Sequence, residues 1–147
     1  MVKIYIYAGG KNKRDWAVPG IEHYIKLLKP YAEVSIEYYP GGARSKESPA
    51  SFINRIPSSI PIVFLDEHGK QFHTVQFARF FTNLTQSEGK IAFALGNHAG
   101  FSNEIVSQAE YVISFSEMTF GHRLSLIILL EQIYRTFDLS SGGKYSR

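Results

Sequence analysis

Hydrophobic residues follow two different patterns along the chain, and together these patterns predict five strands. Residues 2–8 (VKIYIYA) and 32–39 (AEVSIEYY) alternate apolar and polar side chains, which is typical of strands with one solvent-facing side. Residues 60–66, 90–95 and 111–115 are continuous apolar runs instead, which indicates strands covered on both faces.

Between these strands, apolar residues recur at helical spacing. The helical face that precedes the second strand consists of Ile21, Tyr24, Ile25 and Leu28. The helical face that precedes the fourth strand consists of Phe77, Phe80, Phe81 and Leu84. Pro19 suits the first turn of the first helix, and Thr74 is the expected N-cap of the second. Gly100 and Ser102 lead into a further helix, and a long helix is predicted over residues 123–137.

Strands that alternate with helices predict a single α/β domain over residues 1–147, with a mostly parallel sheet and helices on both faces. Residues 40–49 (PGGARSKESP) interrupt the pattern with glycine and charge, and we expect a mobile surface loop there. Ser48 and Pro49 are expected to begin a short helix at the end of this loop.

Composition narrows the possible functions only slightly. The formal net charge of +3 permits a nucleic-acid partner but does not require one. The chain has no cysteine, which excludes disulfides and thiolate chemistry and fits a reducing compartment. Apolar runs at the N-terminus and over residues 124–134 are too short to cross a membrane. We therefore expect a soluble, cytoplasmic protein.

Three loops are expected to meet where the parallel strands end, because ligands in open parallel sheets bind beyond the carboxyl ends of the strands. These loops are Leu65 with Asp66, Gly96 to Gly100, and Ser116 to His122. The glycine loop (GNHAG) lacks the lysine of a phosphate-binding P-loop and the spacing of a dinucleotide fingerprint. By itself it can be a structural turn as well as a ligand loop.

Other candidate chemistry in the chain is weak. Asp66 can be catalytic, but a carboxylate that orders its own loop explains it equally well. His68 and His73 are five residues apart with no supporting cluster of donors, so we predict no metal site. Ser116, His122 and Asp66 could form a hydrolytic trio, but no nucleophile-elbow motif accompanies them.

Basic residues gather in three segments that can bind RNA phosphates: Lys11, Lys13 and Arg14 near the N-terminus, Arg44 and Lys46 in the long loop, and Lys144 near the C-terminus. Each of these can also be a solvated surface segment. Tyr145 lies between Lys144 and Arg147, and this combination of ring and charge suits an unstacked RNA base.

Four segments of the chain together resemble a known protein family. They are GKNKRDWAVPGIEHYIKLL (residues 10–28), IVFLDEHGK (62–70), LGNHAGFS (95–102) and SFSEMTFGHRLSLIILLEQIYR (114–135). Their order and the length of the chain are similar to those of the RlmH family of SPOUT RNA methyltransferases. The last segment is the most specific match.

This resemblance implies a fold, an activity and a set of site residues. Family members have an α/β domain whose C-terminal segment threads a trefoil knot, and they pack as homodimers. They bind S-adenosylmethionine among the three loops named above and methylate N3 of a pseudouridine in helix 69 of 23S ribosomal RNA on the assembled ribosome. By position, the resemblance implies the following cofactor-binding residues: Leu65, Gly96, Asn97, Gly100, Ser116, Glu117, Met118, Thr119, Phe120 and Gly121. It implies a catalytic role for His122, Tyr145 and Arg147, the last two in a tail that serves the neighbouring subunit.

The chain departs from the family pattern at three positions. Asn97 stands where a second glycine is usual, Gly121 replaces a proline, and Ser146 replaces a histidine. Because that histidine could handle a proton, the alternative function is a catalytically weakened homologue that binds RNA or the ribosome. An unrelated α/β nucleotide-binding protein is a third interpretation, which the missing P-loop lysine disfavours.

Overall fold

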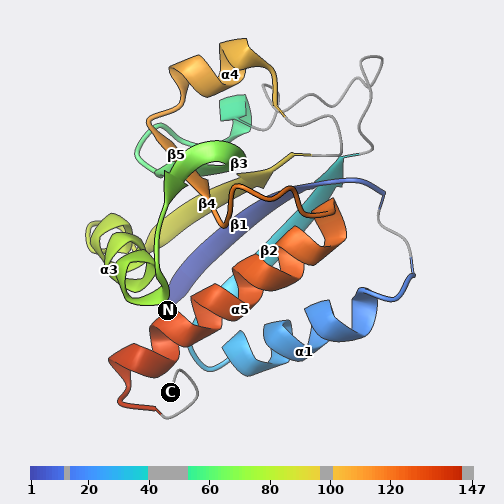
Figure 1. Cartoon of the computed structure of the whole chain (residues 1–147). Helices are drawn as coiled ribbons and strands as arrows, with labels where there is room; N and C mark the ends of the chain where they lie inside the picture. Colours follow the sequence, from blue (N-terminus) through green and yellow to red (C-terminus); the bar gives the residue numbers. More distant parts are fainter. Residues whose placement is uncertain (12–13, 40–52, 97–100, 144–147) are drawn as a thin grey trace.

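A computed structural model of the chain describes residues 1–11, 14–39, 53–96 and 101–143 (Figure 1). The strands of its sheet are all parallel: β1 (Val2–Gly9), β2 (Ala32–Tyr39), β3 (Ile62–Gln71), β4 (Lys90–Leu95) and β5 (Tyr111–Ser114). Their order across the sheet is β2-β1-β4-β3-β5. The helices are α1 (Val18–Leu28), α3 (Thr74–Thr85), α4 (Asn103–Gln108) and α5 (His122–Ser140). The predicted α/β class and parallel sheet are confirmed, and α5 is longer than predicted.

The main hydrophobic core lies on one face of the sheet, where α1, α3 and α5 pack (Figure 1). The sheet contributes Ile6 of β1 and Phe93 of β4, and the helices contribute Ile21, Phe81 and Leu129 to the same cluster. These five side chains are between 0% and 7% exposed. Burial of apolar surface on this scale is the main favourable contribution to folding.

Shorter elements cover the opposite face. Phe101 and α4 pack against β3 and β4, and the ring of Phe101 meets that of Phe64 edge-on, with 5.2 Å between centroids. Residues 53–60 cover the neighbouring part, next to the stacked rings of Tyr7 and Tyr39. Helices therefore lie on both faces as predicted, but the long ones occupy only one face.

The predicted alternation in β1 and β2 is confirmed on the part of the second face that remains open. Lys3, Glu33 and Ser35 are exposed there, while Ile4 and Ile6 point into the main core. The two strands pair in register along their whole length, so their polar residues share one side of the sheet.

β3 begins later than predicted, at Ile62. It also ends later than predicted, because it continues beyond an interruption at residues 66–69. Leu65 pairs with Ile113 of β5 before the interruption, and Lys70 pairs with the same residue after it. At Gly69 the strands β3 and β5 lie so close that an added Cβ would come within 2.6 to 2.8 Å of three main-chain atoms of Ile113. Residues 66–69 therefore form a loop at the end of the sheet where ligands are expected.

The N-cap of α3 is His73, so the prediction of Thr74 as the cap is wrong. The main-chain N–H of Gln76 donates to His73 Nδ1 at 3.3 Å, and the N–H of His73 donates to Gln76 Oε1 at 3.0 Å. This reciprocal pair is a capping box with histidine in the place of serine or threonine. Thr74 donates its hydroxyl hydrogen to Gln132 of α5 at 3.0 Å, because it is the first helical residue and faces that helix.

Ser102 begins α4 as predicted. Its Oγ accepts the main-chain N–H of Ile105 at 3.3 Å, which is the usual N-cap bond of serine. The predicted helix start at Ser48 and Pro49 lies outside the described residues.

Candidate functional site

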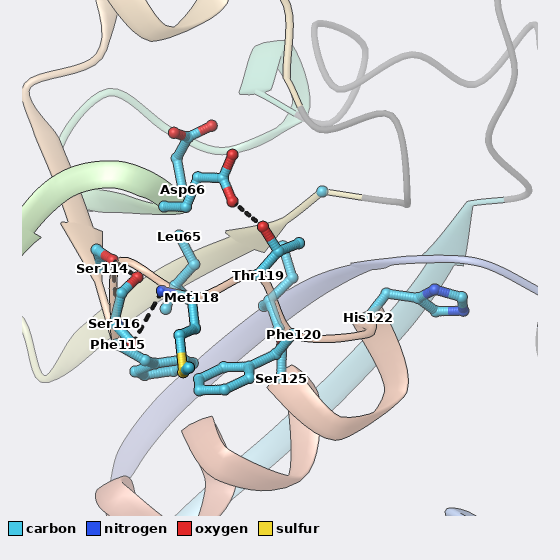
Figure 2. A pocket seen from close by; sticks show the side chains of 13 residues that line it. Leu65, Asp66, Ser114, Phe115, Ser116, Met118, Thr119, Phe120, His122 and Ser125 are labelled. Carbon is cyan, nitrogen blue, oxygen red and sulfur yellow. Dashed lines mark hydrogen bonds between the residues drawn. The ribbon is translucent and has the colours of Figure 1, made fainter.

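A cavity of about 200 Å³ opens at the carboxyl ends of β3, β4 and β5 (Figure 2). Three segments line it: Leu65, Asp66 and Glu67 at the interruption within β3, Leu95 and Gly96 at the end of β4, and Ser114, Phe115, Ser116, Met118, Thr119, Phe120, His122 and Ser125 from the end of β5 to the first turn of α5. The predicted meeting of three loops is confirmed for the residues that the structure describes. Residues 97–100, the rest of the glycine loop, lie outside them.

Asp66 orders the loop that follows the first part of β3. Its carboxylate accepts the main-chain N–H of His68 at 2.9 Å and lies 3.0 Å from Nδ1 of the same residue. The side chain of Asp66 is only 14% exposed, whereas that of His68 is 83% exposed. Of the two interpretations of Asp66, these bonds favour the loop-ordering one.

Two serine turns shape the loop after β5. Ser114 Oγ donates to the carbonyl of Ser116 at 2.7 Å and accepts its N–H at 3.2 Å. Ser116 Oγ in turn accepts the N–H of Met118 at 3.0 Å. Side-chain bonds of this kind replace the main-chain bonds of a regular turn. As a result, Phe115, Met118 and Phe120 all reach toward one side of the pocket (Figure 2).

A hydrogen bond joins two of the loops across the pocket. The hydroxyl of Thr119 donates to the carboxylate of Glu67 (Figure 2). Together with Asp66, Glu67 gives the β3 side of the pocket two carboxylates. The pocket therefore combines an apolar side with an acidic side, an arrangement that favours a ligand with a flat apolar part and a positive charge.

His122 lies at the edge of the pocket, in the first residue of α5, and its imidazole points away from the serine turns (Figure 2). The ring packs on Gly10, where an added Cβ would be 2.6 Å from His122 Nε2. Gly10 has a φ of 105°, which L side chains rarely adopt, and its N–H donates to the carbonyl of Tyr39 at 2.8 Å. The imidazole therefore lies between the pocket and the end of β1.

The structure brings together seven of the predicted site residues: Leu65, Gly96, Ser116, Met118, Thr119, Phe120 and His122. Glu117 and Gly121 are exposed and do not line the cavity, and Gly121 is the N-cap of α5. Sequence reasoning did not include these lining residues: Glu67, Leu95, Ser114, Phe115 and Ser125. Glu67, Leu95 and Phe115 directly adjoin predicted residues, and Ser114 is two positions before Ser116, so their place near strand ends in the sequence could have indicated them.

Several predicted residues lie outside the described part of the chain: Asn97, Gly100, Tyr145, Arg147, Lys13, Arg44, Lys46 and Lys144. Of the predicted RNA-binding residues, Lys11 and Arg14 are described, and both are exposed between β1 and α1. Lys11 directly follows Gly10, the residue on which His122 packs.

Metal and membrane features can be judged for the described ranges alone. Within them, no three histidine or carboxylate side chains are grouped to hold a metal ion. Within the same ranges, no helix has the length and apolar character to cross a membrane. Of the hydrolytic trio, Ser116 and Asp66 form hydrogen bonds within their own loops, to Met118 and His68 respectively.

A model of the family described as "Predicted SPOUT methyltransferase" matches residues 2–146. The chain belongs to the SPOUT methyltransferase family. A relative from Halothermothrix orenii, named ribosomal RNA large subunit methyltransferase H, is 34% identical over 159 residues, which covers 99% of this chain and 100% of the relative. A relative of the same name from Clostridium kluyveri is 35% identical with the same coverage. The resemblance seen in the sequence is thereby confirmed.

Solved structures of SPOUT-like proteins share the fold of this family member at low sequence identity. The SpoU methyltransferase AviRb from Streptomyces viridochromogenes has a TM-score of 0.51 and 16% identity, over 97% of this chain and 61% of that one. A methylase family protein from Haemophilus influenzae has a TM-score of 0.59 and 10% identity, over 99% and 70% of the two chains. At these identities the likeness shows the fold alone.

Proposed function

We propose that this SPOUT family member is an S-adenosylmethionine-dependent methyltransferase that acts on RNA of the large ribosomal subunit. The observation that carries the proposal is the meeting of three loops of the family match in one pocket. The names of the full-length relatives supply the substrate class. The resemblance found in the sequence supplies the finer target, N3 of a pseudouridine in helix 69 of 23S ribosomal RNA.

The residues of the pocket fit S-adenosylmethionine. Phe115, Met118 and Phe120 offer an apolar wall to the adenine ring. The carboxylates of Asp66 and Glu67 complement the positive sulfonium and ammonium groups. Gly96 and the adjoining Asn97 and Gly100 complete the predicted set. When bound, the cofactor supplies a methyl group that is already activated by its sulfonium.

Orientation is then the main task of the protein. Well-oriented reactants can recover about 7–11 kcal/mol of a reaction barrier. The two serine turns and the bond between Thr119 and Glu67 hold the pocket walls in one geometry. Exposed Lys11 and Arg14 attract the RNA backbone, so RNA binding weakens as salt is added.

N3 of the acceptor base must also lose a proton. His122 is our candidate for accepting it, with solvent water as the alternative, because histidine titrates near neutral pH. Its place at the edge of the pocket, beside the basic segment after β1, supports this role. Tyr145 and Arg147 are the proposed substrate contacts of the C-terminal tail.

We also propose the homodimer and the knot that the resemblance implies. Trp16, just before α1, is 67% exposed, and Leu124 in the first turn of α5 is 40% exposed, so a second copy would bury apolar surface there. Ile113 of β5 pairs with both Leu65 and Lys70 of β3. This double pairing supports the knot, because residues 65–70 would enclose β5 if they paired with both of its edges. Figure 1 shows β3 arching over β5.

Mass spectrometry of helix 69 in 23S ribosomal RNA tests the proposal. A deletion strain is expected to lose the methyl group on the pseudouridine, and the intact gene to restore it. A Thr119→Trp variant fills the pocket and is expected not to restore methylation, whereas Thr82→Trp, the same change on the exposed face of α3, is expected to restore it. A methylated pseudouridine that persists in the deletion strain would contradict the target.

The second candidate function is a catalytically weakened homologue that binds RNA or the ribosome, which Ser146 and Asn97 favour. Calorimetry separates the remaining interpretations. The proposal predicts binding of S-adenosylmethionine and transfer of its methyl group to RNA. Cofactor or RNA binding without transfer would favour the weakened homologue, and a preference for ATP would favour an unrelated nucleotide-binding protein.

A further inference from the structure

The start of α5 contacts Gly10, which precedes Lys11, and Asp15, which follows Arg14. His122 packs on Gly10, and Arg123 binds Asp15. Two successive residues of α5 thus contact Gly10 and Asp15, which are more than a hundred positions away in the sequence.

The contact between Arg123 and Asp15 is a buried, two-point ion pair. Arg123 Nε lies 3.0 Å from one carboxylate oxygen of Asp15, and Nη2 lies 2.7 Å from the other. The side chains are 8% and 14% exposed. Tyr38 supports the guanidinium, with its ring centre 5.5 Å from Cζ. The hydrogen bonds to Asp15 raise the pKa of Arg123, so its guanidinium stays charged.

Asp15 also connects this pair to the first turn of α1. Its Oδ1 accepts the main-chain N–H of Ala17 at 3.1 Å, in addition to the bond from Arg123. The carboxylate therefore fixes the end of the basic segment, the start of α1 and the start of α5 relative to one another. A lysine in place of Arg123 could supply the charge but not the two-point geometry.

The segment between the two contacts carries the exposed cations Lys11 and Arg14. His122, which holds the first contact, also lines the pocket. Lys11 directly follows the first contact residue, Gly10, and Arg14 directly precedes the second, Asp15, so the two contacts with α5 constrain where each cation leaves the fold. If one contact loosens, the cations can still attract RNA, but they no longer hold it at a fixed distance from the pocket.

We propose that Asp15 and Arg123 are positioning residues for methyl transfer, which hold the phosphate-binding segment in register with the cofactor pocket. This inference rests on the proposed function. It separates two properties: cofactor binding depends on the three loops, while the alignment of the RNA depends on the ion pair. Neither residue lines the pocket, so neither is expected to touch the cofactor.

A second ion pair in the same helix provides a matched control. Arg135 Nε lies 3.0 Å from Glu131 Oε1, one helical turn earlier, and the side chains are 26% and 31% exposed. The printed bond of Arg135 in this pair stays within α5, although Glu131 also accepts the hydroxyl of Tyr24 of α1 at 3.0 Å, and the pair does not line the pocket. The same change, arginine to lysine, can therefore be compared at an arginine that pairs with another element and at an arginine that pairs with a residue of its own helix.

The test compares Arg123→Lys, Asp15→Glu and Arg135→Lys with the unaltered chain. Circular dichroism reports the fold, calorimetry the affinity for S-adenosylmethionine, and a methyl-transfer assay on ribosomal particles gives kcat and KM. We expect Arg123→Lys and Asp15→Glu to keep cofactor affinity within about twofold and to lose about 10- to 100-fold in kcat, since a displacement of about 1 Å can cost about 100-fold. Arg135→Lys is expected to match the unaltered chain.

Each result bears on the inference. Unchanged kcat in a folded Arg123→Lys variant would overturn it, and so would a parallel loss of cofactor affinity, which indicates a general structural role. If Arg123→Lys does not fold, Asp15→Glu, which keeps both charges and moves the carboxylate by one methylene group, decides the question by the same criteria. Absence of transfer by the unaltered chain would overturn the proposed function together with the inference, whereas transfer unaffected by the variants would overturn the inference alone.

Discussion

Substitution of Gly69 by alanine tests the close contact between β3 and β5 most directly. The added Cβ would come within 2.6 Å of the carbonyl carbon of Ile113 and within 2.8 Å of its N and Cα. These atoms belong to the main chain of a paired strand and cannot rotate away, as the end of a side chain could. One of the two strands must therefore move.

The expected cost follows from this geometry. Overpacking a close-packed interior costs about 1–3 kcal/mol, and an obstacle made of main-chain atoms places Gly69→Ala near the upper end. For a chain of this length, a loss of about 3 kcal/mol lowers Tm by about 6–12 °C. Because Gly69 follows the pocket residues Asp66 and Glu67 in the same interruption of β3, the same shift would also distort the pocket.

Equilibrium denaturation followed by circular dichroism measures the change in the free energy of unfolding. Gly20→Ala is the matched control: it adds the same methyl group, but at 3.1 Å from the movable Cδ1 of Ile127. A helical alanine is favoured over glycine by about 0.5–1 kcal/mol, so this control is expected to be close to neutral. If Gly69→Ala were as stable as Gly20→Ala, the close approach of β3 to β5 would be refuted.

Three further predictions follow from single contacts. Leu129→Ala removes a fully buried side chain from the main core, so the free energy of unfolding is expected to fall by about 2–5 kcal/mol in the same denaturation assay. A hydrogen bond to Glu110 raises the pKa of Tyr111 above 10.0; the stabilisation is present below that pH and is lost as pH rises through the raised pKa. Glu110→Gln is therefore expected to lower the phenolate titration of Tyr111, and an unchanged ultraviolet titration would contradict this. In a double-mutant cycle, Glu67→Gln and Thr119→Val should show a coupling of about 1 kcal/mol in stability, and additive effects would argue against their bond.

The strands were predictable because their burial is encoded locally. β4 is central in the sheet, and its continuous apolar run, KIAFAL, predicted a strand covered on both faces. β2 is at the edge, and its alternation predicted the exposure of Glu33 and Ser35. The meeting of the three loops was predictable for a similar reason, since parallel strands end at the same edge of a sheet.

Contacts between residues that are distant along the chain could be found only from the folded structure. The pairing of Lys70 with Ile113 and the ion pair of Asp15 with Arg123, 108 positions apart, leave no mark in any local pattern of apolar residues. Such contacts depend on the path of the whole chain, and a periodicity describes only which face of an element is buried. The pattern of residues was therefore enough to predict the elements, their buried faces and the edge of the sheet where the site lies, whereas packing determined which side chains meet there.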